Sequence, residues 1–456
     1  MSELIRRLLF DYRGVVPMTW VYFSSLLAIA LYFKFNRLWS LRNLDLICLI
    51  LLTPGLVTEA LGREEGKPYF EYFGYVWLFV IGIIFLIRLL LDPMMVRRPL
   101  LEPNLSVGGL TFLGVALMVF LMARVATVDP NELNPGGATA GEESAVAAAT
   151  TSEKAAVAPA LARTETSSAQ RPGYPLLRLL PSITTQRFSR DFVTQHGAPV
   201  PHESLVASRL IIIASHLSVV LGLVLIGYWH FDNIKTGVAA AVLYLLLPYM
   251  PAMMGRPDHV LPAAFLVWAV ALYRRPILSG IFIGLAAGTI YYPLFLLPLW
   301  ISFYWQRGLW RFCLGMVVTV GLLVGLLALR ANDLSVFIHD IKEMFGIWWP
   351  ITENLEGFWR IPGISPEYRL PVLTLFVVLA FSFALWPAQK NLGTLMSCTA
   401  ALMLAAQFWH AHGGGLFMAW YLPLLLLTVF RPNLEDRIAL SVIGEGWLPR
   451  RGRQAA

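Results

Sequence analysis

Five consecutive residues, Gly255-Arg256-Pro257-Asp258-His259, place a guanidinium, a carboxylate and an imidazole at the mouth of an apolar segment. Proline suits the first turn of a helix, and the N-terminal end of a helix stabilises a carboxylate such as that of Asp258. An arginine, an acid and an imidazole this close together could bind a phosphate or move a proton. Charged residues at the boundary of an apolar helix are equally typical of an ordinary solvated end, so both interpretations stay open.

A second set of candidates lies between residues 330 and 370, a long stretch between two apolar segments. Trp359 and Arg360 sit there among other aromatic, acidic and basic side chains, namely Trp348, Trp349, Glu353, Glu356 and Arg369. Aromatic rings beside carboxylates suit the binding of a sugar. They are equally typical of the aromatic belt that membrane proteins place at the bilayer interface. We take Trp359 and Arg360 as candidate substrate contacts, with the belt as the alternative.

Two histidines, His410 and His412, precede three consecutive glycines and form a third candidate. A His-x-His pair can contribute to a metal site, but a zinc site takes three or four protein ligands, and no third ligand stands nearby in the sequence. The pattern therefore predicts a flexible polar turn and no metal site, while a divalent metal stays possible. We retain His410 as a candidate substrate contact.

The composition indicates the class of protein in which these residues act. Hydrophobic residues make up 57% and charged residues 14% of the 456 residues, against roughly 45–50% and about 25% in soluble proteins. The apolar residues fall in blocks of about twenty, long enough to cross the roughly 30 Å hydrocarbon core of a bilayer as helices. The sequence predicts an all-α, polytopic helical membrane protein that is embedded in the lipid bilayer, its expected partner.

Several other classes of protein find no support in the sequence. The net charge of +7 does not indicate nucleic acid as a partner, because the basic residues sit in short loops between apolar blocks. The three cysteines lie in apolar blocks without paired spacing, which excludes a disulfide framework. There is no phosphate loop, dinucleotide fingerprint or nucleophile elbow. Asp45 and Glu59, near the ends of one apolar block, are either boundary charges or functional intramembrane acids.

Residues 1–125 form a predicted N-terminal module of four membrane spans, at roughly 16–33, 44–61, 72–91 and 106–124. Residues 126–170 are rich in Ala, Thr, Ser, Glu and Gly and have no aromatic side chain, which predicts a disordered extracytoplasmic linker. Residues 171–205 mix leucines and phenylalanines with arginines, a pattern typical of an amphipathic segment on a membrane surface.

Residues 206–432 form a predicted second module with nine further spans, at about 207–227, 236–253, 259–273, 277–290, 292–306, 311–329, 371–388, 394–410 and 415–430. The total is about thirteen transmembrane helices. Tyr291-Tyr292-Pro293 divides one long apolar run, because a proline disfavours helix in the residue before it. Residues 433–456 end in a run with Arg450, Arg451 and Arg453 and are expected to form a cytoplasmic tail.

Placing this tail in the cytoplasm gives a consistent topology for the second module. The turns with Arg274-Arg275, Arg311 and Lys390 then fall inside, as the positive-inside rule requires. The linker, the Gly255–His259 run, the 330–370 loop and the His410 turn fall outside. The arginines near the N-terminus break the rule in this arrangement, so the orientation of the first span stays open.

Part of the second module is similar to a known family of membrane enzymes. Residues 255–312 read GRPDHVLPAAFLVWAVALYRRPILSGIFIGLAAGTIYYPLFLLPLWISFYWQRGLWRF. They resemble the middle of GT-C superfamily glycosyltransferases, especially bacterial polyprenol-phosphate-mannose-dependent mannosyltransferases. The matching positions are an acid that opens a span, a basic turn, a Gly-rich helix, a turn that ends in proline, and an arginine that closes the next helix. Trp420-Tyr421-Leu422-Pro423 is similar to the family's closing helix, and the resemblance covers about residues 171–432.

The resemblance implies an inverting glycosyltransferase in a bacterial inner (cytoplasmic) membrane. The donor would be a polyprenyl-phosphate sugar, such as a mannose, and the acceptor an envelope lipid, glycan or protein at the outer face. In the family the catalytic acid lies in the first outer loop, which here points to Asp191 as general base. Asp258 and Arg256 would then lie at the donor phosphate, with His259, Tyr291, Tyr292 and His410 as further substrate contacts. No certain cofactor is implied.

Two departures from the family pattern keep other functions open. Tyr291 and Tyr292 stand where the family often has a lysine before the proline of the outer turn. The family's acid is displaced onto the segment after the linker. A non-catalytic membrane protein of envelope assembly is therefore one alternative. A transporter is the other, although the sequence has no run of intramembrane carboxylates that would suggest a proton relay.

Overall fold

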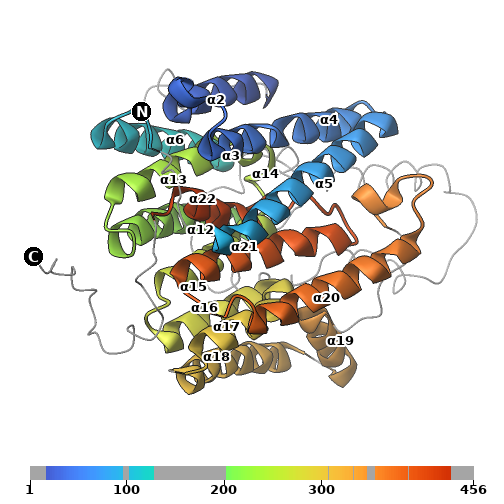
Figure 1. The fold of residues 1–456 in the computed structure, drawn as a ribbon. Helices are drawn as coiled ribbons and strands as arrows, with labels where there is room; N and C mark the ends of the chain where they lie inside the picture. The colour runs from blue at the N-terminus through green and yellow to red at the C-terminus, as the bar shows by residue number, and fades with distance from the viewer. Residues whose placement is uncertain are drawn as a thin grey trace, which may run out of the picture.

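The computed structural model describes residues 17–95, 102–127, 202–306, 308–331, 333–346, 355–388 and 390–432. Within these ranges the chain is helical and contains no β-strand, which confirms the predicted all-α class (Figure 1). Asp191 and the tail 433–456 lie outside the described residues. So do the linker 126–170 and the surface segment 171–205, except at their edges. These edges correct the predicted boundaries, because one helix continues to Thr127 and the next begins at His202.

In the described part of the N-terminal module the helices are α2 Pro17–Tyr32, α3 Leu41–Ile50, α4 Leu52–Glu64, α5 Pro68–Leu91 and α6 Val107–Thr127. The second module begins with α12 His202–Trp229, α13 Ile234–Leu246, α14 Tyr249–Met253, α15 Pro257–Ala271 and α16 Pro276–Thr289. It continues with α17 Leu297–Tyr304, α18 Leu309–Arg330, α19 Leu334–Phe345, α20 Arg369–Leu385, α21 Leu392–Trp409 and α22 Leu422–Phe430. Short 3-10 turns include η2 Asp92–Met94, η3 Tyr292–Leu296, η4 Gly357–Arg360 and η6 Met418–Trp420.

Each predicted span coincides with one or two of these helices. By length and composition, seven helices in the described part of the chain could cross a membrane: Leu41–Arg63, Pro68–Met94, Val107–Ala126, Arg209–Trp229, Leu309–Leu329, Pro366–Leu385 and Leu392–Trp409. Five shorter apolar helices accompany them, at Thr19–Tyr32, Ile234–Leu246, Pro257–Ala271, Pro276–Thr289 and Tyr292–Tyr304. The structure therefore supports a multi-pass membrane protein, and the number of thirteen crossings stays a prediction.

The structure differs from the predicted segments where prolines and glycines interrupt the apolar pattern. The predicted span 236–253 ends as a helix at Leu246, and a short separate helix follows from Tyr249, because Pro248 cannot donate a backbone hydrogen bond. The predicted break at Tyr291–Pro293 is confirmed, since α16 ends at Thr289 and a 3-10 turn leads into α17. The amphipathic helix α19, inside the 330–370 stretch, was not predicted.

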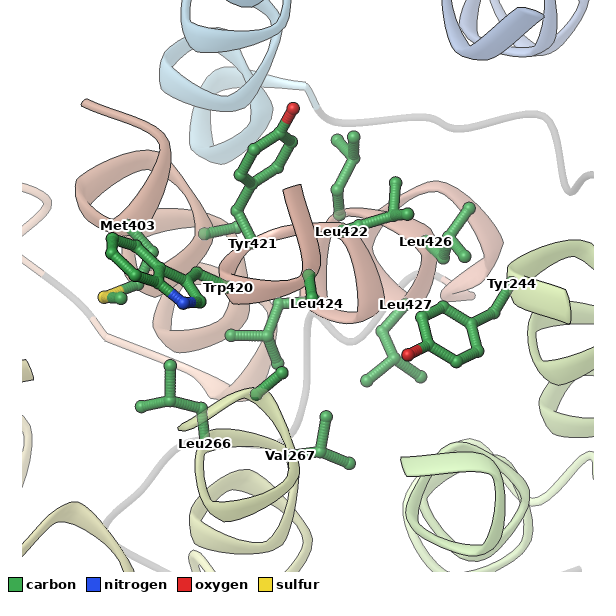
Figure 2. Close-up of a cluster of buried hydrophobic side chains, with 14 of the residues drawn as sticks. Tyr244, Leu266, Val267, Met403, Trp420, Tyr421, Leu422, Leu424, Leu426 and Leu427 are labelled. Carbon is green, nitrogen blue, oxygen red and sulfur yellow. The ribbon is translucent and has the colours of Figure 1, made fainter. Parts of the chain in front are cut away.

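Helices α21 and α22 lie at the centre of the described bundle. All nine residues of α22 are buried, and α21 packs against α5 of the N-terminal module as well as against α20 and α22. Figure 2 shows the cluster around α22, in which Leu424 and Leu427 lie near Leu266, Val267 and Tyr244 of neighbouring helices. By contrast, α18 has largely exposed apolar side chains such as Val317, Val318 and Leu329. Such faces are expected where helices contact lipid.

Glycines allow the closest helix contact in the second module. A Cβ atom at Gly280 would collide with the backbone oxygen of Phe312, and one at Gly315 would collide with that of Ile277. Small residues at such positions let the backbones of α16 and α18 approach each other. The Gly-rich pattern that carries part of the family resemblance therefore has a packing reason in this chain.

We expect Gly280→Leu to destabilise the protein by about 1–3 kcal/mol, because the side chain would force α16 and α18 apart. Gly321→Leu is the matched control, since a Cβ atom at Gly321 on α18 meets nothing within 4 Å. Thermal unfolding of the purified variants in detergent would measure the difference. Equal unfolding temperatures for the two variants would contradict this view of the helix contact.

Candidate functional site

One end of the bundle brings together most of the candidate residues that lie in the described chain. We call it the His410 end; it contains the start of α15, the turn before α17, and residues 410–420. The opposite end, here called the Arg431 end, contains the turns after α15, α17 and α20, and Arg431 after α22. The helices alternate in direction between these ends along the second module. Residues that are far apart in the sequence thus share one site.

Asp258 is held in the first turn of α15, as the sequence predicted. Arg256 has an extended backbone and precedes Pro257, which occupies the first helical turn. The Asp258 side chain is buried, and its Oδ2 lies 3.5 Å from a guanidinium nitrogen of Arg256. The indole Nε1 of Trp420 donates a 3.0 Å hydrogen bond to the Asp258 backbone oxygen. The turn before α22 therefore holds the backbone at Asp258, while Arg256 contacts its carboxylate.

His259 links this carboxylate to a tyrosine. The Tyr249 hydroxyl lies 2.8 Å from Nδ1 of His259, and Nε2 of the same ring lies 3.8 Å from Oδ2 of Asp258. The backbone N–H of Ala419 also donates a hydrogen bond to the Tyr249 hydroxyl. The hydroxyl therefore accepts from Ala419 and donates to Nδ1, which leaves the Nε2 proton of His259 facing Asp258.

His410 is a buried neutral imidazole with a fixed tautomer. Its Nδ1 accepts a 3.0 Å hydrogen bond from the backbone N–H of His412, so Nε2 carries the proton. The side chain is 2% exposed, and burial lowers the pKa of His410 to about 3. Within the described residues, Nε2 has no hydrogen-bond partner. At neutral pH the ring thus offers a buried N–H donor without carrying a charge.

Aromatic rings surround His410 and join it to His259. The Phe417 ring lies 4.4 Å from the His259 ring and 4.7 Å from the His410 ring, between centroids. Tyr292 lies 5.5 Å from His410 and 5.2 Å from Trp420. Both histidines therefore pack against one phenylalanine, so Asp258, which precedes His259, and His410 belong to the same cluster.

Tyr291 and Tyr292, in the turn between α16 and α17, form a pair at the edge of this cluster. The Tyr291 hydroxyl donates to the Tyr292 hydroxyl over 2.8 Å. Burial raises the pKa of Tyr291 to about 12, although the positive charge of Arg369 opposes the shift. Arg369 itself donates two hydrogen bonds, of 3.2 and 3.0 Å, to the backbone oxygen of Trp409. The Arg369 guanidinium is thus held at the His410 end by the last residue of α21.

Trp359 and Arg360 take different positions from one another. The Trp359 indole is 5% exposed and donates a 3.1 Å hydrogen bond to the backbone oxygen of Phe408, whereas Arg360 is exposed. The indole of Trp359 is therefore buried against the protein, and its N–H already donates to a backbone oxygen of α21. Their role in substrate binding stays a prediction. The sequence alone assigned no role to Tyr249. Its hydrogen-bond partner His259, ten residues later, was the one signal that could have pointed to it.

The described residues contain no group of three or more His, Cys, Asp or Glu side chains arranged to hold a metal ion. The rings of His259 and His410 each pack against the Phe417 ring.

Comparisons with known proteins add no relative to this picture. No family model matches the chain, and no curated protein or solved structure is similar to it.

Proposed function

We propose that this protein is a membrane glycosyltransferase that moves a sugar, a hexose such as mannose, from a polyprenyl-phosphate donor to an envelope lipid, glycan or protein. The observation that carries the proposal is the convergence of one buried carboxylate, Asp258, with two donors, the Arg256 guanidinium and the His410 Nε2–H. Transfer from a phosphate needs these two kinds of group, a proton acceptor and donors for the leaving anion.

In the proposed reaction, an acceptor hydroxyl oxygen attacks the anomeric carbon of the donor sugar. The bond between this carbon and the phosphate oxygen breaks, and polyprenyl phosphate leaves with the bonding electrons. The hydroxyl proton passes to the Asp258 carboxylate, which acts as general base. Attack opposite the leaving group inverts the anomeric configuration. His259 lies beside the carboxylate, with its Nδ1 held by Tyr249 and its Nε2 3.8 Å from Oδ2, which is longer than a hydrogen bond.

The leaving phosphate gains negative charge as the bond breaks. Arg256, which is partly exposed, can form charge-assisted hydrogen bonds to its oxygens. The Nε2–H of His410 is a second, pre-oriented donor that costs no reorganisation, because its tautomer is already fixed. Arg256 also balances the charge of Asp258, so a carboxylate beside a phosphate is less strongly repelled.

The arrangement of the helices supports a lipid-linked donor and an outer-face site. The apolar faces of helices such as α18 and α20 would let a polyprenyl chain remain in the bilayer. Arg274, Arg275, Arg311 and Lys390 all lie at turns of the Arg431 end. The positive-inside rule assigns that end to the cytoplasm, and hence the His410 end to the outer face of a bacterial inner membrane.

We expect Arg256→Ala to raise the KM for the donor by about 10- to 100-fold, because a charge-assisted hydrogen bond to the phosphate contributes about 1.5–3 kcal/mol. The kcat should change less. Arg311→Ala, an exposed arginine of the Arg431 end, is the control. The assay would follow the label in radiolabelled polyprenyl-phosphate mannose in membranes with and without the protein. Protein-independent turnover, or an unchanged KM, would contradict the assignment.

A further inference from the structure

The N-terminal module, which no motif or resemblance explains, buries a polar network at the His410 end. Glu59 and Arg63 stand one turn apart on α4 and form an ion pair. The Tyr75 hydroxyl, on α5, donates a 3.3 Å hydrogen bond to Glu59 Oε1 and lies 3.4 Å from an Arg63 nitrogen. Glu59 and Tyr75 are each 2% exposed. Burying an ion pair has a desolvation cost that often exceeds its attraction, so its presence in an apolar hairpin calls for a reason other than stability.

Close helix packing holds this network in place. A Cβ atom at Gly74 of α5 would lie 2.7 Å from the backbone nitrogen of Glu59. Gly62 likewise lies against the backbone of Glu71, where no larger side chain would fit. The hairpin of α4 and α5 is therefore rigid at the level of Glu59, and Tyr75 is anchored at a defined position.

Tyr75 contacts the backbone of two loops of the second module. Gly357 and Gly413 both have positive φ angles, of 72° and 63°. A Cβ atom at Gly357 would lie 2.9 Å from a ring carbon of Tyr75 and 3.0 Å from the Gly413 Cα, and one at Gly413 would lie 3.7 Å from the Tyr75 hydroxyl. The backbone N–H of Glu356 donates a 3.0 Å hydrogen bond to the Ala411 oxygen. The tyrosine, the 356–357 loop and the 410–415 turn thus form one packed unit.

The same unit lies beside the groups that we assign to the phosphate. His410 and His412 belong to the turn that Tyr75 supports, and the bond between them fixes the His410 tautomer. Arg256 is close enough to Glu59 for its positive charge to stabilise that carboxylate. The α14 helix, three residues before Arg256, packs against α4. A change in the hairpin of α4 and α5 would therefore shift both groups that we assign to the phosphate, the Arg256 guanidinium and the His410 imidazole.

We propose that Glu59, Arg63 and Tyr75 are positioning residues that hold Arg256 and the His410–Gly415 turn in place, so that the N-terminal module completes the site of the second module. This inference rests on the proposed function for its catalytic meaning. The Tyr75 hydroxyl is tied to the acid and the arginine, and its ring supports the two glycine positions. Loss of the hydroxyl releases the ring, the turn shifts, and the His412 N–H no longer fixes the buried His410.

Tyr75→Phe tests the inference because it removes only the hydroxyl. Tyr72→Phe, one turn earlier on α5 and half-buried, is the matched control. We expect diethyl pyrocarbonate to modify His410 about fivefold faster in Tyr75→Phe than in the wild type, in proportion to the loss of one hydrogen bond. Mass spectrometry of the peptide with His410 and His412 would give the rate. In the transfer assay, the donor KM should rise by a similar factor while kcat stays within about twofold.

The outcomes separate this inference from the proposed function. Faster modification of His410 in Tyr75→Phe, without any sugar transfer by the wild type, would support the positioning role and contradict the proposed glycosyltransferase function. Unchanged modification in Tyr75→Phe, with or without a lower unfolding temperature, would reduce the network to a structural element and overturn the inference. If Tyr75→Phe does not fold, Glu59→Gln, which keeps the size of the side chain, replaces it under the same criteria.

Discussion

Replacing Asp258 by asparagine is expected to slow sugar transfer by about 10²- to 10⁴-fold, the usual effect of removing a general base. Asparagine keeps the shape of the side chain and can still accept a hydrogen bond from Arg256, but it cannot take up the proton of the acceptor hydroxyl. The donor KM should therefore change little. Initial rates of polyprenyl phosphate release by the purified variant, at saturating donor, would measure the loss.

The control for this variant is Asp232→Asn, the same chemical change at an exposed position of the Arg431 end. Asp232 has a positive φ of 52°, a conformation that asparagine also adopts. Helix content and thermal unfolding should match the wild type in both variants. A folded Asp258→Asn protein with more than half of the wild-type rate would exclude Asp258 as the base.

The second large effect is expected on stability, at the Arg431 end. Arg88 forms bonds of 2.8 and 3.0 Å to Asp45 and one of 3.2 Å to Asp92, and Arg431 forms a 2.8 Å bond to Asp92. Asp92 is 0% and Arg431 5% exposed. The network ties α3 and α5 of the N-terminal module to the end of α22. It therefore holds the two modules together far from the proposed site.

We expect Asp92→Asn to destabilise the protein by about 3–5 kcal/mol, because it leaves the buried Arg431 without a counter-charge while Arg88 keeps Asp45. Adding Arg431→Met should recover most of this loss. The double variant removes the charges of both Asp92 and Arg431, and a methionine side chain fills a similar volume to that of arginine. Chemical unfolding in detergent, followed by tryptophan fluorescence, would give the free energies. A double variant no more stable than Asp92→Asn would show that the pair is not the cause.

The order of the helices could be predicted from the sequence because apolar blocks, prolines and basic turns mark their ends directly. The helix start at Pro257 and the turn at Tyr291–Pro293 are such local signals, and both were predicted correctly. The break at Leu51 between α3 and α4 was missed because the apolar pattern continues through it, although Pro54 in the first turn of α4 is a local signal for the break. Helix α19 was missed because its twelve residues are amphipathic and too short for a span.

The site was predicted in pieces whose connection depends on the fold. Asp258 and His410 were each candidates for local reasons, and their convergence requires the path of α15 and α21. Glu59 appeared in the sequence only as an acid at the end of a span. Its partner Tyr75 lies on the next helix, and the loops it supports come more than 280 residues later. Packing of glycines, which sets this geometry, leaves little trace in composition or spacing.

Turnover of a synthetic polyprenyl-phosphate mannose by the purified protein in detergent tests the central claim most directly, with Asp258→Asn and Asp191→Asn measured beside the wild type. The proposal predicts steady release of polyprenyl phosphate by the wild type, a new glycosidic bond of inverted configuration, and at least about a hundredfold slower release by Asp258→Asn. Full activity of Asp191→Asn would remove that residue, assigned only by resemblance, from the site. Equal release by the wild type and Asp258→Asn, or no release by a folded wild type with any envelope acceptor, would contradict the account.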